Sequence, residues 1–155
     1  HDDYIRSQLS QRLAYYNEWQ EYLGYIASRL QRYSSQRDKL KGESFVHGFT
    51  LAMASLNRFY RPVSEQDCQQ GYVDLFLRPE LEIYKDMRHS YIIELKYAKS
   101  KDTDQRVEQL RQEAIDQAHR YADTEVVKRG VGHTQLHQIV VVYRGMEMVV
   151  CEEIA

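Results

Sequence analysis

Three charged residues stand inside two otherwise apolar stretches of this chain. Asp74 interrupts the run from 72 to 77, and Glu94 and Lys96 interrupt the run from 91 to 97. Because side chains alternate along a β-strand, Glu94 and Lys96 should project from the same face of their strand. A carboxylate buried in such a strand is costly unless it is paired or binds a metal. Two strand carboxylates with a lysine two residues on therefore predict a site that holds a divalent cation beside a water molecule to be activated.

A helix at about 103–123 supplies polar side chains that fit the same site. Its apolar stripe runs from Val107 to Ala114, and Gln117 and Tyr121 continue the stripe at three- and four-residue steps. A glutamine on a buried face needs hydrogen-bond partners, which a cleft holding phosphate and water would provide. Taken alone, the motif would suit a Gln–Tyr pair at the edge of the core. Beside the acidic strands, we favour the cleft.

The hydrophobic pattern also predicts the elements that position these residues. Most of the first forty residues read as helix, with a connector at 34–38, and a second helix is expected at about 43–57. Strands are expected at about 60–66, 71–78, 90–97, 137–144 and 146–151. A polar excursion, 79–89, separates the two acidic strands. This order indicates an α/β sandwich around a mixed sheet, preceded by helical segments.

Composition limits the classes of protein. The chain has 155 residues, 43% of them hydrophobic and 28% charged, which is ordinary for one globular domain. No apolar run approaches the roughly twenty residues of a membrane span. Cys68 and Cys151 give neither a disulfide framework nor a zinc spacing, which suits the cytoplasm. The chain begins at His1, which suggests a piece of a longer protein.

The charge balance leaves two interpretations open. A net charge of −2 counts mildly against tight nonspecific DNA binding, but not against an enzyme whose acidic site binds metal. Five basic side chains are candidates for a phosphate-facing rim: Lys99, Lys101, Arg106, Arg111 and Arg120. Because Glu108 and Glu113 interleave with them, an ordinary solvated helix face is the alternative.

Three motifs, read together, resemble a known family. They are Gly-x-x-Asp-Leu-x-Leu at 71–77, Tyr-Ile-Ile-Glu-Leu-Lys at 91–96 and Ala-Ile-Asp-Gln-Ala-x-x-Tyr-Ala-Asp at 114–123. With Glu43 on a preceding helix, they resemble the PD-(D/E)XK nuclease superfamily over about 43–150. In detail they are similar to the branch found as the C-terminal nuclease-like domain of bacterial AAA-ATPase-like proteins.

The chain departs from the family pattern at two places. The proline that names the superfamily is absent, because Val73 precedes Asp74. Tyr72 stands where this branch often has a basic residue, so one phosphate contact would be missing or supplied elsewhere. The resemblance implies a restriction-endonuclease-like mixed sheet of about five strands flanked by helices. Residues 1–42 would be a helical extension or a linker to a missing upstream domain, and 43–155 the nuclease-like domain.

The resemblance also implies roles for the strand residues. Asp74, Glu94 and the backbone carbonyl of Leu95 would bind Mg²⁺ or Mn²⁺. Lys96 would orient or deprotonate the attacking water and offset the charge that develops on the phosphate.

Residues on the two helices would complete the site. Glu43 would be a further catalytic carboxylate, which would either support the ligands of the first metal or bind a second metal. Gln117 and Tyr121 would position the nucleic-acid backbone or the metal's surroundings. His47 lies one turn after Glu43 and is a candidate ligand, although a lone helix histidine is more often a hydrogen-bonded residue at the core edge.

These roles predict a metal-dependent nuclease that hydrolyses phosphodiesters, with DNA as the favoured substrate. The alternative is a catalytically silent interaction or regulatory domain attached to an AAA-type ATPase. A third interpretation, an ordinary buried Glu94–Lys96 ion pair, leaves Gln117 and Tyr121 unexplained. The apolar surface of the first forty residues needs a partner, and a homodimer is one candidate. No membrane association is expected.

Overall fold

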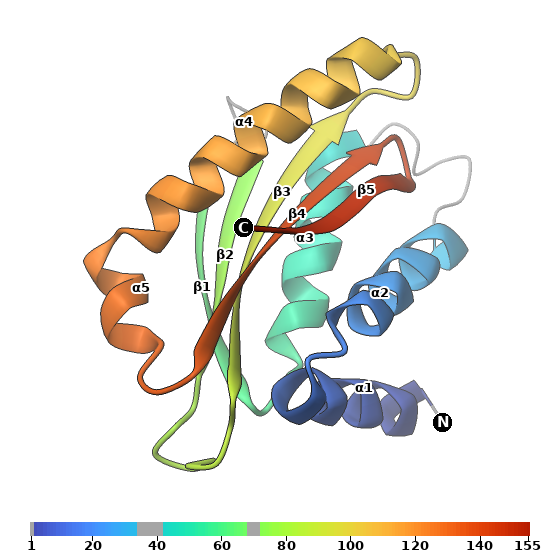
Figure 1. Ribbon diagram of the computed structural model, residues 1–155. Coiled ribbons are helices and arrows are strands. Elements are labelled where there is room, and N and C mark those ends of the chain that lie inside the picture. The colour runs from blue at the N-terminus through green and yellow to red at the C-terminus, as the bar shows by residue number, and fades with distance from the viewer. Residues whose placement is uncertain (1, 34–41, 68–71) are drawn as a thin grey trace.

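The computed structural model describes residues 2–33, 42–67 and 72–155 of the chain. An open five-stranded sheet with the order β1-β2-β3-β4-β5 forms the centre of this part (Figure 1). The strands are β1 (Tyr60–Asp67), β2 (Tyr72–Pro79), β3 (His89–Ala98), β4 (Gln135–Arg144) and β5 (Glu147–Ile154). Neighbouring strands are antiparallel, except that β3 and β4 run parallel. The expected mixed sheet of about five strands is confirmed, and Pro62 lies in an edge strand, where a missing backbone N–H is tolerated.

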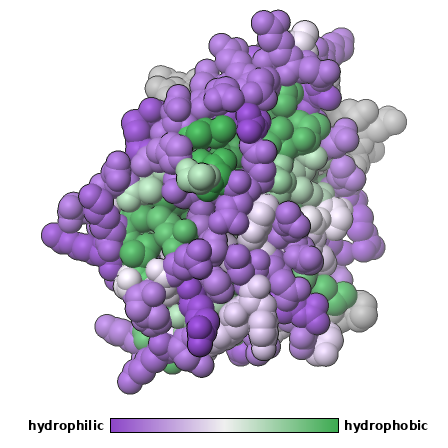
Figure 2. Space-filling view, viewed as in Figure 1, coloured by the Kyte–Doolittle hydropathy of each residue, from purple (hydrophilic) through white to green (hydrophobic). Residues whose placement is uncertain are grey.

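The parallel pair β3–β4 requires a crossover, because parallel strands cannot be joined by a tight turn. α4 (Asp104–Ala122) and α5 (Glu125–Gly130) make this crossover and cover one face of the sheet. The hydroxyl of Thr103 accepts a hydrogen bond from the Arg106 backbone N–H, which caps the start of α4. In the view of Figure 2, hydrophilic side chains dominate the surface and hydrophobic ones form separate patches.

Three helices cover the other face of the sheet (Figure 1). They are α1 (Asp2–Tyr16), α2 (Trp19–Tyr33) and α3 (Gly42–Ser55). Their apolar faces and the sheet form one core, in which Leu13, Leu30 and Val46 are buried with Leu75 and Ile93. The sheet therefore covers the apolar surface of α1 and α2. Among the described helices, none combines the length and apolar character needed to cross a membrane.

The helical region expected over most of the first forty residues is confirmed, but it is divided into two helices, α1 and α2. The chain turns between α1 and α2, and Asn17 adopts a φ of 57° there. Asparagine enters this left-handed region more readily than most residues, because its side chain can bond locally. Gly24 lies inside α2. The connector expected at 34–38 lies outside the described residues.

Candidate active site

Asp74 and Glu94 face each other directly in the antiparallel pairing of β2 with β3. Residues opposite one another in such a pair have Cβ atoms roughly 4.5–5.5 Å apart and point to the same face. That face is the one under α4, because Phe76 and Ile92, two residues along each strand, pack against Ala118 of α4. The strand register therefore brings the two acidic residues together beneath a helix.

The pair is withdrawn from water and lacks hydrogen-bond donors. Glu94 is 0% exposed and Asp74 is 9% exposed. The Glu94 oxygens Oε1 and Oε2 and the Asp74 oxygen Oδ1 accept no hydrogen bond from any described residue. Burying ionised carboxylate oxygens without hydrogen-bond donors costs folding free energy, so binding of a proton or a cation would stabilise this pair.

The pKa of Glu94 leads to the same conclusion. Burial raises the pKa of the Glu94 carboxyl group to about 10, and the neighbouring Asp74 adds to the rise. Two ionised carboxylates cannot donate hydrogen bonds to each other, but a protonated Glu94 can donate its O–H to Asp74. Without a cation, the pair therefore holds one proton at neutral pH.

Lys96 is the basic group nearest this pair along the sheet. It follows Glu94 by two residues and shares its face, and its side chain is 3% exposed. The Nζ atom lies 3.9 Å from Oε2 of Glu113 on α4. Burial lowers the pKa of Lys96, and the nearby carboxylates of Glu94 and Glu113 counter that effect in part. A lysine in this state can serve both as a hydrogen-bond donor and as a proton acceptor.

A cavity of about 370 Å³ opens beside Lys96. Four side chains of α4 complete its lining: Glu113, Asp116, Gln117 and Arg120. Their spacings of three and four residues put them on one helix face. Arg120 belongs electrostatically to the acid pair, since its charge favours the ionised form of Glu94. Gln117 carries a buried Oε1 that accepts no hydrogen bond from the described residues.

Two of the basic residues expected at a phosphate-facing rim differ in their surroundings. Arg120 lines the cavity, whereas Arg111 is bound to Glu152 of β5 and to Glu108. Glu113 and Asp116 line the cavity although they were not among the residues predicted for the site. Their helical spacing from Gln117 was the available signal, because residues three or four apart share a helix face.

Gln117 and Tyr121, expected to frame one cleft, lie in different surroundings. Gln117 lines the cavity. Tyr121 is buried in a cluster with Phe76, Ile92 and Val127, and its hydroxyl donates to the carbonyl of Val63 at 3.4 Å. Tyr121 thus fastens α4 to β1 and β2 beside the site.

Glu43 and His47 lie on α3, which covers the opposite face of the sheet. His47 is fully buried with its ring edge-on to Tyr97, at a centroid distance of 6.5 Å. Burial, and then the charge of Lys96, lower the pKa of His47 to about 4. Burial raises the pKa of Glu43, and its charge is felt at Tyr97. Within the described residues, no hydrogen bond or ion pair joins either residue to the Asp74–Glu94 pair.

The side chains that could hold a metal are therefore few. In the described parts of the chain, no group of three or more His, Cys, Asp or Glu residues is arranged to bind a metal ion. The two facing carboxylates offer oxygen atoms without donors, which is the ligand type that Mg²⁺ and Mn²⁺ prefer. Mg²⁺ normally keeps several waters and takes only one or two carboxylates, so this pair fits such an ion.

A family model for the PD-(D/E)XK nuclease superfamily matches residues 41–153, which contain α3, β1 to β4, α4, α5 and all of β5 except its last residue. No curated protein matches the sequence.

Proposed function

The chain belongs to the PD-(D/E)XK nuclease superfamily, and from that premise we propose that it is a metal-dependent nuclease that hydrolyses phosphodiester bonds, with DNA as the favoured substrate. The observation that carries the proposal is the buried Asp74–Glu94 pair, whose oxygens lack donors. A site that served only to stabilise the fold would gain nothing from two facing carboxylates under a helix.

We assign the binding of Mg²⁺ or Mn²⁺ to the carboxylates of Asp74 and Glu94, with the backbone carbonyl of Leu95 as a further ligand. When bound, such a cation supplies a more acidic water and neutralises charge on the phosphate. Binding requires Glu94 to give up its proton, because a protonated carboxyl is a poor ligand.

In this proposal Lys96 assists the attacking water beside the Asp74–Glu94 pair. Its buried ammonium can hold a water molecule by hydrogen bond, and its lowered pKa increases the fraction of neutral amine that is able to accept a proton from that water. As an ammonium it also offsets negative charge that develops on the phosphate. We propose that Gln117 and Arg120, which line the adjoining cavity, contact the phosphate backbone.

The remaining expected residues receive indirect roles in this proposal. Tyr121 holds α4 over the sheet and so sets the position of Gln117 and Arg120. His47 acts through Lys96 in this proposal, because the charge of Lys96 lowers the pKa of His47 across the sheet, and Glu43 lies one turn before His47 on α3.

One observation favours the second function, a catalytically silent domain attached to an AAA-type ATPase. Glu113 and Asp116 line the cavity and would repel a phosphate backbone. The overall charge of −2 acts in the same direction. Such a domain would keep the fold and bind a protein partner without cutting nucleic acid.

A cleavage assay separates the two functions. The protein is incubated with linear, nicked and single-stranded DNA and with RNA, in Mg²⁺, Mn²⁺ or chelator. A nuclease cuts at least one substrate, only with metal, and loses this activity in Asp74→Asn and Lys96→Ala. The exposed Lys128→Ala on α5 is the matched control. If nothing is cut, or if both site variants cut like the parent, the nuclease proposal is wrong.

A further inference from the structure

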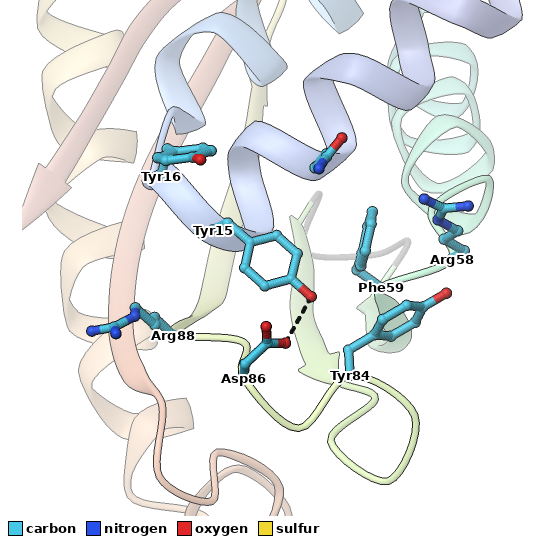
Figure 3. A pocket seen from close by; sticks show the side chains of 8 residues that line it. Tyr15, Tyr16, Arg58, Phe59, Tyr84, Asp86 and Arg88 are labelled. Atoms are coloured by element: carbon cyan, nitrogen blue, oxygen red, sulfur yellow. Dashed lines mark hydrogen bonds between the residues drawn. The ribbon is translucent and has the colours of Figure 1, made fainter.

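A second cavity lies far from the acid pair and has no role in the proposed cleavage. It has a volume of about 530 Å³ and lies between the end of α1, the junction of α3 with β1, and the β2–β3 connection (Figure 3). Its lining residues Tyr15, Phe59 and Tyr84 pack on the core under α1, α2 and α3, on the opposite face from α4. The β2–β3 connection also lies at the end of β3 away from Glu94 and Lys96.

Aromatic rings from three separate segments form one part of this cavity. Phe59 is buried as the floor. Tyr15 of α1 meets it edge-on at a centroid distance of 5.7 Å, and Tyr84 of the β2–β3 connection lies 4.7 Å from it. Figure 3 shows these rings turned toward one another around a common space. Flat rings held in this manner offer surfaces on which another planar ring can stack.

Two arginines flank the rings. The guanidinium of Arg58 lies 4.8 Å from the centre of the Phe59 ring, and Arg88 lies on the other side of Asp86 in Figure 3. Within the described residues neither arginine has an ion-pair partner, whereas Arg29, Arg111 and Arg144 all do. Two unpaired guanidinium groups at an aromatic cavity suit a ligand that carries both a ring and an anionic group.

Asp86 adds an acceptor between the rings and Arg88. Its Oδ1 accepts a hydrogen bond from the Tyr15 hydroxyl at 3.0 Å, which fixes both side chains. The other oxygen, Oδ2, accepts no hydrogen bond from the residues that the structure describes. A carboxylate is an acceptor only, so it would favour a base with an exocyclic amine over one without.

A neighbouring cavity of about 530 Å³ extends this site past Arg88. Both cavities have Asp86 and Arg88 in their lining, and the second adds His89, His133 and Gln135. His89 Nδ1 lies 2.9 Å from His137 Nε2.

The histidines form an ordered chain of hydrogen bonds. His137 Nδ1 lies 2.8 Å from Oε2 of Glu153, so this carboxylate accepts the Nδ1–H of His137. Nδ1 of His89 and Nε2 of His137 share one hydrogen bond, whose donor depends on the tautomers of the two rings. Nε2 of His89 takes no part in this contact and can exchange a hydrogen bond with a sugar hydroxyl, which both donates and accepts.

We propose that this composite cavity binds a nucleotide, with the base against Tyr15 and Tyr84 and the phosphate at Arg88. The base places an exocyclic amine at Asp86, and the sugar lies toward His89. The nucleotide is either free or one unit of a single strand of nucleic acid. Each cavity falls within the range of about 300–1,000 Å³ that is usual for small-molecule sites. The proposal does not depend on the nuclease assignment.

Binding is measured with the full chain in chelator, which prevents metal-dependent hydrolysis. The probes are AMP, UMP and fluorescent single-stranded oligo-dA and oligo-dT, followed by calorimetry or fluorescence anisotropy. We expect AMP or oligo-dA to bind, and to bind more tightly than UMP or oligo-dT. We expect Tyr84→Leu and Arg88→Gln each to weaken binding by about tenfold. The exposed positions Tyr4→Leu and Arg129→Gln are the matched controls.

Each outcome of these measurements either supports or contradicts nucleotide binding at the composite cavity. Binding of AMP identifies a free nucleotide as ligand, and binding of the oligonucleotide alone identifies a strand. No binding of any probe overturns the proposal, as does binding that survives both Tyr84→Leu and Arg88→Gln. Arg88 is exposed, so Arg88→Gln tests the site without threatening the fold. Thermal unfolding of each variant verifies that the fold is kept, and Asp74→Asn should bind the nucleotide as the parent does.

Discussion

Asp74 and Glu94 are direct partners across the β2–β3 ladder, which places two carboxyl groups on one face of the sheet beneath α4. Three of their four oxygens accept no hydrogen bond from the described residues. We therefore expect the stability of the protein to depend on pH and on divalent cations, and to change when either residue is substituted.

Replacing Glu94 should stabilise the metal-free protein at alkaline pH. The folded-state pKa of about 10 lies above the ordinary 4.5, so the contribution of Glu94 is fully present below pH 4.5 and is lost as pH rises toward 10. At pH 8 in chelator, Glu94→Gln should be more stable than the parent by on the order of 2–4 kcal/mol. Urea unfolding measures the difference. The exposed Glu82→Gln should match the parent, and a less stable Glu94→Gln would refute this account.

Divalent cations should stabilise the parent protein and release a proton on binding. The proton comes from the carboxyl pair, so affinity for Mn²⁺ should rise with pH. Calorimetric heats should vary with the ionisation enthalpy of the buffer, and Mn²⁺ should raise the melting temperature. Asp74→Asn should show neither effect. Equal heats in all buffers would mean that the pair does not hold a proton before metal binds.

Lys96→Met should separate catalysis from metal binding. Removing the amine takes away a proton acceptor and a charge near the phosphate, which typically costs roughly 10²–10⁴-fold in rate. Mn²⁺ affinity should be kept, because a cation near the metal is removed rather than a ligand. Single-turnover cleavage and calorimetry together measure the two effects. Lys128→Met is the control, and joint loss of metal binding and activity would point to a structural role for Lys96.

Arg120→Gln should weaken substrate binding more than the chemical step. Arg120 lines the cavity beside Lys96, where it can neutralise one phosphate. The KM for DNA should rise, and the slope of log KM against log salt should fall by about one. Cleavage at 50, 100 and 200 mM salt provides the measurement. Lys128→Gln on α5 should leave the slope unchanged, and an unchanged slope in Arg120→Gln would exclude a phosphate contact.

His47 should make the protein sensitive to acid. Its folded-state pKa of about 4 lies below the ordinary 6.5, so its contribution is present above pH 6.5 and is lost as pH falls toward 4. Over that range the parent should lose about 1–3 kcal/mol more stability than His47→Leu. Urea unfolding at pH 7, 5.5 and 4 gives the comparison. His119→Gln changes an exposed histidine and should follow the parent; identical pH profiles for His47→Leu and the parent would contradict the burial argument.

Much of the site could be found from residue types and periodicity. Asp74, Glu94 and Lys96 stand out because charge inside an apolar strand is rare. Gln117 stands out because it continues an apolar helix stripe. These signals are local, and each depends only on the period of one element.

The remaining features depend on how elements meet. Asn17 separates α1 from α2, although the hydrophobic pattern of the first forty residues is nearly continuous. His137 finds its carboxylate partner in Glu153, sixteen residues away on the neighbouring strand. Glu43 and His47 follow the order expected of the family, but α3 packs on the face opposite α4.

The sequence by itself determined the type of elements and the identity of the charged residues inside them, because side-chain alternation and helical spacing are written in short stretches of chain. Only the tertiary structure decided that Asp74 meets Glu94, because a shift of one residue in the β2–β3 register would have turned Asp74 to the opposite face. It also decided that Gln117 and Arg120 line the cavity while Tyr121 packs between α4 and the sheet. Those contacts depend on the docking angle of a helix on a sheet, which no local pattern encodes.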